Sequence, residues 1–291
     1  MLAVIAETPG PIDTVVIRDV PEPGELRAGE VVVRMLVSTF NPSDEVTVSG
    51  AYASRTTFPL VSGFEGVGII DRIGPGVPTS ALGQRVLPIG SPGAWQQYKR
   101  IDHSWCIPVP DDIPTDVACF AYINPLTASL MVERFCHGVQ SALVDAATTT
   151  IAGHLKTLLE QRGIETVMVG RTWGTVGVDK QFDVAFDCVG GEMGRRVARA
   201  VKPDGAVVHY GLLSGEPLGE TGRRVEMFRL RDVVHACPRS ELPELFVDVF
   251  AQLRAGRLCS RVAREVHLRD VPAALREYQP REGKLLIRIG H

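Results

Sequence analysis

The chain has 291 residues, of which 45% are hydrophobic and 22% charged, and its formal net charge is −3. These values are ordinary for a soluble globular enzyme with two domains or one large one. They give no reason to expect nucleic acid or a membrane as a partner, and no apolar run reaches the length of a membrane span. Residues 1–7 lack the basic region of a secretory signal, and the six cysteines form no Cys-x-x-Cys pair. We therefore expect a cytoplasmic protein with reduced thiols.

Residues 1 to about 120 are rich in short β-branched runs, which are bounded by turns containing Pro and Gly. Such runs predict strands, and their frequent turns favour a small barrel or sandwich-like domain. The predicted strands cover residues 15–17, 31–37, 68–70, 85–89 and 96–99.

From residue 124 onward, predicted helices and strands alternate. A helix begins at Asn124-Pro125, and a strand at 142–144 leads through a turn at 145–150 into a helix at 151–162, with leucines at helical spacing. Alternation of this kind predicts an α/β fold with a doubly wound parallel sheet. Further strands are predicted at 167–169, 182–191, 205–211, 262–266 and 284–289.

Five segments in this order resemble the medium-chain dehydrogenase/reductase superfamily, specifically its zinc-free branch. They are Asn41-Pro42-Ser43-Asp44, Gly63-Phe64-Glu65-Gly66-Val67-Gly68, Asn124-Pro125-Leu126-Thr127-Ala128, Asp187-Cys188-Val189-Gly190-Gly191 and Gly283-Lys284-Leu285-Leu286-Ile287-Arg288. Zinc-dependent members place a Cys at the position of Asn41 and a His at that of Phe64. Asn is a poor zinc ligand and Phe is none, so the resemblance implies that this chain holds no metal.

The resemblance also implies an architecture. A GroES-like β-rich catalytic domain would comprise residues 1–123 and 256–291, because the closing segment of such proteins returns to the first domain. A Rossmann-type nucleotide-binding domain would comprise residues 124–255. Relatives form homodimers by pairing the last strands of this sheet, and here the apolar segment 232–237 is expected at that place. Alternatively, this segment is a buried strand of a monomer, or the dimer forms through the strand edge that a missing third strand would expose.

The expected phosphate-binding turn departs from the glycine-rich pattern, because Ala147, Thr149 and Ala152 stand at its key positions. Thr148, Thr149, Thr150 and Ile151 open the following helix and could offer hydroxyl and N–H groups to a phosphate. Alternatively, they only cap the helix and tighten the turn. Asp145 precedes them, and its negative charge is expected to repel a pyrophosphate.

The segment after the second predicted strand of this domain is short. Ten residues separate Arg171 from Phe182, whereas a parallel crossover needs a dozen or more. We therefore predict that the third strand is missing, which leaves the second strand at the edge of the sheet. Arg171 ends that second strand, where an arginine can accommodate the 2′-phosphate of NADPH. The alternative is a solvated charge at a strand end.

The resemblance implies catalytic roles for Tyr52, which matches the proton-handling tyrosine of 2-enoyl thioester reductases, and for Asn41, which would border the nicotinamide or the substrate. Thr127 would lie beside the nicotinamide, although it could equally cap its helix. A phenol can donate a hydrogen bond to a developing enolate, whereas a packing role for Tyr52 stays open.

The expected function is thus an NADPH-dependent, zinc-independent reductase of an activated C=C bond, preferably a 2-enoyl thioester. One alternative is a quinone or enone oxidoreductase. Another is a protein that has lost nucleotide binding and serves a non-redox biosynthetic or binding role.

Overall fold

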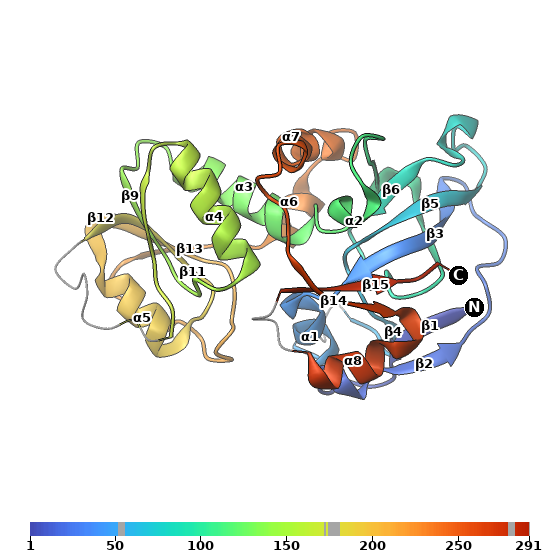
Figure 1. Cartoon of the computed structure of the whole chain (residues 1–291), viewed down its shortest axis with the longest axis horizontal. Helices are drawn as coiled ribbons and strands as arrows, with labels where there is room; N and C mark the ends of the chain where they lie inside the picture. Colours follow the sequence, from blue (N-terminus) through green and yellow to red (C-terminus); the bar gives the residue numbers. More distant parts are fainter. Residues whose placement is uncertain (52–55, 172, 174–180, 279–282, 291) are drawn as a thin grey trace. The chain divides into compact units, whose positions relative to one another are not determined.

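The computed structural model describes the whole chain except residues 52–55, 172, 174–180, 279–282 and 291. The chain divides into two compact units (Figure 1). The first unit comprises Met1–Ile123 and Val234–His291, and the second comprises Asn124–Val233.

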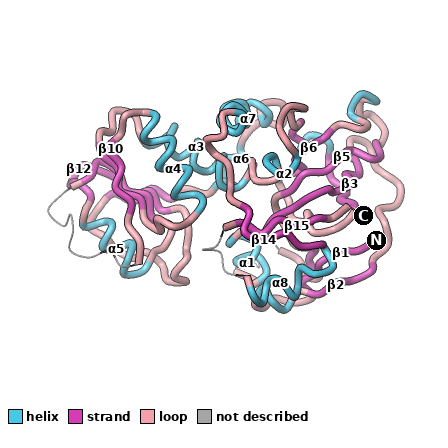
Figure 2. Tube along the Cα trace, in the orientation of Figure 1, coloured by secondary structure: helices cyan, strands magenta, loops and turns pink. Residues whose placement is uncertain are grey.

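The first unit is built mainly from two sheets, as the strand-rich pattern of its sequence predicts (Figure 2). In the described part of the chain, the smaller sheet has the order β2-β1-β4, and the larger has the order β14-β15-β3-β5-β6-β8, with β7 also paired to β3. Its strands are β1 (Leu2–Ala6), β2 (Val16–Asp19), β3 (Glu30–Thr39), β4 (Leu60–Val61), β5 (Gly66–Ile73), β6 (Arg85–Pro88), β7 (Tyr98–Asp102), β8 (Cys106–Pro108), β14 (Val262–His267) and β15 (Lys284–Arg288).

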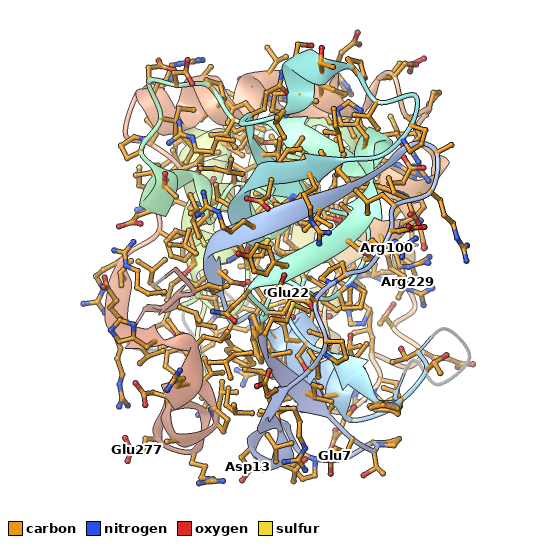
Figure 3. All side chains as sticks on the ribbon, turned by 90° about the vertical axis from the view of Figure 1, so that its right-hand side faces the viewer. Glu7, Asp13, Glu22, Arg100, Arg229 and Glu277 are labelled. Atoms are coloured by element: carbon orange, nitrogen blue, oxygen red, sulfur yellow. The ribbon has the colours of Figure 1, made fainter. Side chains whose placement is uncertain are left out.

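The core of the first unit lies around β3, whose Val31, Val33 and Met35 pack with the fully buried Trp95. Gly63 has a positive φ of 88° and lies against this indole; an added Cβ would come within 2.3 Å of Trp95 Cδ1. The helices of this unit are α1 (Pro42–Val48), α2 (Thr115–Ala118), α7 (Val247–Arg254) and α8 (Val271–Glu277). Charged side chains such as Glu7, Asp13 and Glu277 lie on its outer surface (Figure 3).

The second unit contains a parallel sheet of the order β10-β9-β11-β12-β13 in the described part of the chain. The α/β fold class with a GroES-like sheet domain and a Rossmann-type parallel sheet is thereby confirmed. Its strands are β9 (Ser141–Val144), β10 (Glu165–Met168), β11 (Phe182–Asp187), β12 (Val201–His209) and β13 (Arg224–Met227), and its helices are α3 (Ile123–Phe135), α4 (Thr150–Gln161) and α5 (Gly191–Arg199). Among the described residues β10 is an edge strand, where a third strand would otherwise pair.

One predicted strand is wrong. Segment 232–237, expected as the last strand of the parallel sheet, lies almost wholly in the helix α6 (Leu230–Ala236), and the last strand is instead β13. Only Val234 of this helix is buried, so the apolar run does not have the two-sided burial of a central strand. Asp232 in its first turn and His235 in its last turn suit the helix dipole, which favours the helical conformation.

Candidate functional site

Asn41 lies immediately before α1, at the point where β3 has ended. Its N–H donates to Asp44 Oδ2 at 2.7 Å, and Pro42 begins the helix, where its missing N–H costs nothing. The other carboxyl oxygen of Asp44 accepts from the N–H of Phe64 at 3.0 Å. Asp44 therefore connects the start of α1 to the glycine-rich segment before β5.

The side chain of Asn41 is fully buried and both ends of its amide are engaged. Its Nδ2 donates to Glu65 Oε2 at 2.8 Å, and its Oδ1 accepts from Lys284 Nζ at 2.5 Å. Glu65 Oε1 also accepts from two backbone N–H groups, those of Tyr122 at 2.8 Å and Ile123 at 2.7 Å. We call Asn41, Asp44, Glu65 and Lys284 the Asn41–Lys284 cluster.

Burial dominates the electrostatics of this cluster. It raises the pKa of Asp44 to about 7, raises the pKa of Glu65 and lowers that of Lys284. The opposite charges of Glu65 and Lys284 counteract these shifts, because each favours the ionised form of the other. A lysine ammonium therefore binds the oxygen of Asn41, the position at which zinc-dependent relatives place a thiolate. Within the described ranges, no group of three or more His, Cys, Asp or Glu residues could hold a metal ion.

Tyr52 belongs to residues 52–55 and lies outside the described part of the chain. Its catalytic role stays a prediction, and so does that of Asn41, whose buried amide holds α1 in place through Glu65 and Lys284. Thr127 lies within α3 and is 7% exposed, so it does not cap that helix.

The residues predicted to hold phosphate lie where the carboxyl ends of the parallel strands meet the following loops. Thr148 and Thr149 follow β9, and Thr150 and Ile151 are the first two residues of α4. Thr149 caps this helix, because its Oγ1 accepts from Ala152 N at 3.3 Å. The backbone N–H groups of Thr150 and Ile151 are at the helix N-terminus, the usual place for a phosphate.

Arg171 is exposed and follows the end of β10, the neighbour of β9 in the sheet. Because the two strands are parallel, Arg171 and the α4 N-terminus lie at the same edge of the sheet, which is where doubly wound sheets bind ligands. Binding of a nucleotide by these residues stays a prediction.

Asp145 differs from its expected arrangement. Its carboxyl does not face solvent at the turn but is fully buried, and its Oδ1 accepts from the N–H of Cys188 at 3.0 Å. Burial, followed by the neighbouring Asp187, raises the pKa of Asp145 to about 8. The expected repulsion of a pyrophosphate requires an ionised carboxyl, so it does not apply to the neutral form that prevails at neutral pH.

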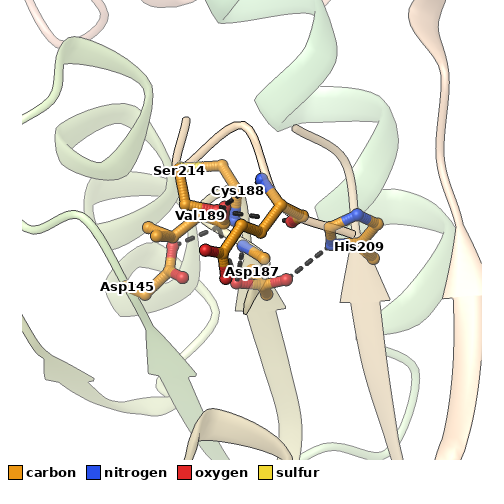
Figure 4. A network of polar contacts seen from close by, with 8 residues as sticks. Asp145, Asp187, Cys188, Val189, His209 and Ser214 are labelled. Carbon is orange, nitrogen blue, oxygen red and sulfur yellow. Dashed lines mark hydrogen bonds and ion pairs between the residues drawn. The ribbon is translucent and has the colours of Figure 1, made fainter. Parts of the chain in front are cut away.

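Asp145 belongs to a polar network at the carboxyl ends of β9, β11 and β12 (Figure 4). Asp187 ends β11; its Oδ1 accepts from the N–H groups of Val189 at 3.2 Å and Gly190 at 3.0 Å, and its Oδ2 pairs with His209 Nδ1 at 2.5 Å. Burial raises the pKa of Asp187, but the His209 hydrogen bond and the other donors outweigh it and lower the pKa overall. We call Asp145, Asp187, Cys188, His209 and Tyr210 the Asp145–His209 cluster.

Two of these functional candidates escaped the sequence reasoning. Lys284 was visible only as part of a family marker, although a lysine among the apolar residues of a strand signals a buried charge that needs a partner. His209 ends the largely apolar strand β12. Its contact with Asp187 depends on the parallel pairing of β11 with β12, in which Asp187 lies directly beside His209.

The sequence matches two family models. The one named "Alcohol dehydrogenase GroES-like domain" matches residues 27–111, and the one named "Zinc-binding dehydrogenase" matches residues 162–285. A mitochondrial enoyl-[acyl-carrier-protein] reductase of Arabidopsis thaliana is 28% identical over 249 residues, which is 74% of this chain and 66% of the relative. A Bos taurus protein of the same name is 27% identical over 84% of this chain and 76% of its own length. The chain thus spans just under two thirds of the Arabidopsis relative.

Solved structures resemble the whole chain. A candidate NADPH:quinone reductase of Bacillus thuringiensis superposes with a TM-score of 0.89 at 27% identity, covering 99% of both chains. Escherichia coli quinone oxidoreductase, solved with NADPH, superposes with a TM-score of 0.86 at 19% identity, covering 99% of this chain and all of the other, which shows a shared fold. No helix in the described ranges has the length and apolar character needed to cross a membrane.

Proposed function

Because this chain belongs to the medium-chain dehydrogenase/reductase superfamily, we propose that it is an NADPH-dependent oxidoreductase that reduces an activated carbon–carbon double bond without zinc. The preferred substrate class is a 2-enoyl thioester, and a quinone or enone is the alternative. The enoyl reductases among the relatives favour the first class, and the quinone reductases among the similar structures favour the second.

The observation that carries this proposal is the bond from Lys284 to Asn41. In the zinc-dependent branch this position supplies a thiolate ligand, but here the amide oxygen already accepts from an ammonium at 2.5 Å. The charge of Lys284 favours the ionised form of Glu65, and among the described residues no group of three or more His, Cys, Asp or Glu side chains could hold a metal ion. We therefore assign substrate activation to hydrogen bonding, which suits a conjugated carbonyl because its charge develops on one oxygen.

Bound NADPH would supply the hydride for the β-carbon. The residues around α4 and β10 fit such a cofactor: the α4 N-terminus offers the N–H groups of Thr150 and Ile151, and Arg171 is exposed at the end of the neighbouring strand. Tyr52 would donate to the thioester oxygen as the enolate forms and guide a proton to the α-carbon. The neutral form of Asp145 removes one objection to phosphate binding at this turn.

Calorimetric titration with NADPH, followed by an assay of NADPH oxidation, tests this function. Micromolar binding and faster oxidation with a crotonyl thioester than with a quinone are the expected results. Faster oxidation with the quinone would shift the substrate to the alternative class. No binding at millimolar NADPH would overturn the reductase and favour the non-redox role, which the altered phosphate turn would then explain.

A homodimer is also proposed. Among the strands that the structure describes, β13 is the last of its sheet and presents an exposed Met227. An unpaired strand edge invites pairing with a second copy. Cytoplasmic localisation remains the expectation from the sequence.

A further inference from the structure

The carboxyl group of Asp145 occupies an unusual position for an acidic side chain. It is fully buried. Among the described backbone groups only the N–H of Cys188 donates to it, at 3.0 Å from Oδ1. No donor in the described structure reaches its other oxygen, Oδ2. An ionised carboxylate would leave that oxygen buried and unsatisfied, which is costly in the absence of water.

The neighbour of Asp145 resolves this problem only if Asp145 carries a proton. The carboxyl group of Asp187 neighbours that of Asp145, and two carboxyl groups can share a hydrogen bond only when one of them carries a proton. Asp187 is the partner that keeps its charge, because it accepts from Val189, Gly190 and His209. Asp145, with one backbone donor, is the partner that keeps the proton.

The turn that follows Asp145 depends on this anchorage. Asp145 N–H donates to Phe186 O at 3.1 Å, and Ala147 N–H donates to Val169 O at 3.0 Å, so the turn is held between β11 and the end of β10. Between them Ala146 adopts a φ of 47°, a left-handed conformation that is unfavourable for alanine. A strained turn of this kind persists only while its surroundings hold it.

We propose that Asp145 is a proton-carrying positioning residue, whose hydrogen bond to Asp187 holds the β9–α4 turn in the conformation that binds the phosphates of NADPH. This inference rests on the proposed cofactor. It makes one proton a requirement for nucleotide binding: once the proton leaves, two adjacent carboxylates repel each other beneath a ligand that is itself an anion.

Cys188 and Tyr210, two other titratable groups of the cluster, do not lose protons in the same range. Asp187 and Cys188 face Asp145 from the end of β11, and Tyr210 faces it from beyond β12, with His209 behind Asp187. Burial raises the pKa values of Cys188 and Tyr210 well above their usual range, so both stay neutral. On α4 the first titratable residue is His154, which is buried within the helix packing. Burial raises the pKa of Asp145 to about 8, which sets the range in which binding should weaken.

The expected effect is a loss of NADPH affinity at alkaline pH. With a pKa of about 8, the protonated fraction falls to roughly a tenth at pH 9, so the apparent Kd should rise about tenfold between pH 7 and pH 9. Asp145→Asn mimics the protonated acid, because its amide can donate to Asp187 and accept from Cys188. This variant should bind NADPH as the wild type does at pH 7 and lose most of the alkaline weakening. Glu160→Gln, which removes an exposed carboxylate of α4, is the matched control. Its affinity for NADPH should weaken at alkaline pH as that of the wild type does.

Infrared spectroscopy of the protein without nucleotide supplies a readout independent of NADPH. The C=O stretching band of protonated carboxylic acids should be stronger in the wild type than in Asp145→Asn at pH 7, because acids such as Asp44 contribute to both proteins and Asp145 only to the wild type. This difference band should disappear as the pH passes 8. The absence of a difference band between the two proteins at pH 7 would overturn the proton assignment. A difference band together with a Kd that does not change between pH 7 and pH 9 would overturn the link to binding. A difference band without any NADPH binding would overturn the proposed cofactor and the link, while the proton on Asp145 would stand.

Discussion

Lys284 and Asn41 are joined by a hydrogen bond of 2.5 Å, although 243 positions of sequence separate them. Lys284 begins β15, and Asn41 lies just before α1, so this bond fastens the last strand of the larger sheet to the start of a helix formed early in the chain. With Glu65 it makes a buried set of one cation, one anion and one amide, in which every partner depends on the others.

Lys284→Met should destabilise the protein strongly. The substitution keeps most of the side-chain volume but leaves Glu65 as a buried charge without its cation, an effect typically worth about 3–5 kcal/mol. Urea unfolding measures the change. Lys202→Met is the control, because Lys202 forms an ion pair with Asp183 but is 41% exposed. Its loss should lower the free energy of unfolding far less. Equal destabilisation by the two substitutions would contradict the importance given to the buried pair.

Tyr52→Phe should lower the turnover of a crotonyl thioester by roughly 10²–10⁴-fold, the range typical of general acid–base contributions. NADPH binding should be unaffected, because the phenol is assigned to the substrate oxygen. Tyr98→Phe, a half-buried tyrosine on β7, serves as the control and should retain its turnover. Turnover like that of the wild type in Tyr52→Phe would remove this residue from the mechanism.

Arg171→Ala should abolish the preference for NADPH over NADH. A charge-assisted bond from a guanidinium to a phosphate contributes about 1.5–3 kcal/mol, which corresponds to roughly 10–150-fold in affinity. Only NADPH binding should weaken, so the two titrations separate this role from general damage. The control is Arg195→Ala, because Arg195 pairs with Glu192 on the surface of α5. Equal binding of NADPH and NADH by the wild type would mean that Arg171 is only a solvated charge at a strand end.

The stability of the protein should depend on pH through Asp145. Its pKa in the folded state is about 8, above the value of about 4 expected when unfolded, so the folded state binds the extra proton between these values. Stability therefore falls as the pH rises through this window, by up to about 1.4 kcal/mol per pH unit relative to Asp145→Asn. Denaturation of both proteins at pH 5, 6 and 7 measures this difference. A constant difference across the three pH values would mean that Asp145 is already ionised in the folded protein.

Met227→Asp should dissociate the proposed dimer. Met227 ends the edge strand β13 and is 56% exposed, and a charge at this place opposes strand pairing between two copies. Sedimentation at micromolar concentration should then give a mass near the 31.6 kDa of one chain. Leu82→Asp is the control, because Leu82 is similarly exposed, at 54%, but belongs to the first unit. A wild type that already sediments as a single chain would rule out the dimer.

Periodicity and turn residues predicted the alternating helices and strands of the second unit, whereas the GroES-like and Rossmann-type architecture was predicted from the resemblance to a known superfamily. The leucines of α4 and its closing Gly163 located that helix to within one residue at each end, and the short link after Arg171 predicted the edge position that β10 has among the described strands. Segment 232–237 was misassigned because a run of two valines between polar residues fits a strand and a short helix equally well. Its helical state agrees with the burial of Val234 alone and with the positions of Asp232 and His235 in the first and last turns of the helix.

The candidate site was less accessible to sequence reasoning. The position of Asn41 was identified, but its partner Lys284 lies on a strand that reaches it only after the sheet has assembled. The orientation of Asp145 could not be predicted either, because the same residue at a strand end can turn toward solvent or toward the neighbouring strand. Here Cys188 N–H and Asp187 on β11 decide this orientation.

The position of β15 has a consequence for how the chain folds. This strand lies between β14 and β3, so the larger sheet stays divided until residues 284–288 have been synthesised. The described strands of the parallel sheet in the second unit lie between residues 141 and 227, so this sheet can form earlier on the ribosome. In the first unit, by contrast, more than 240 residues are added after α1 begins before Lys284 can bind Asn41. During this time the apolar side chains of β3 and the carboxyl group of Glu65 lack their contacts with β15. Closure by contacts so distant in sequence is intrinsically slow, and this interval is when the nascent chain is most exposed to aggregation.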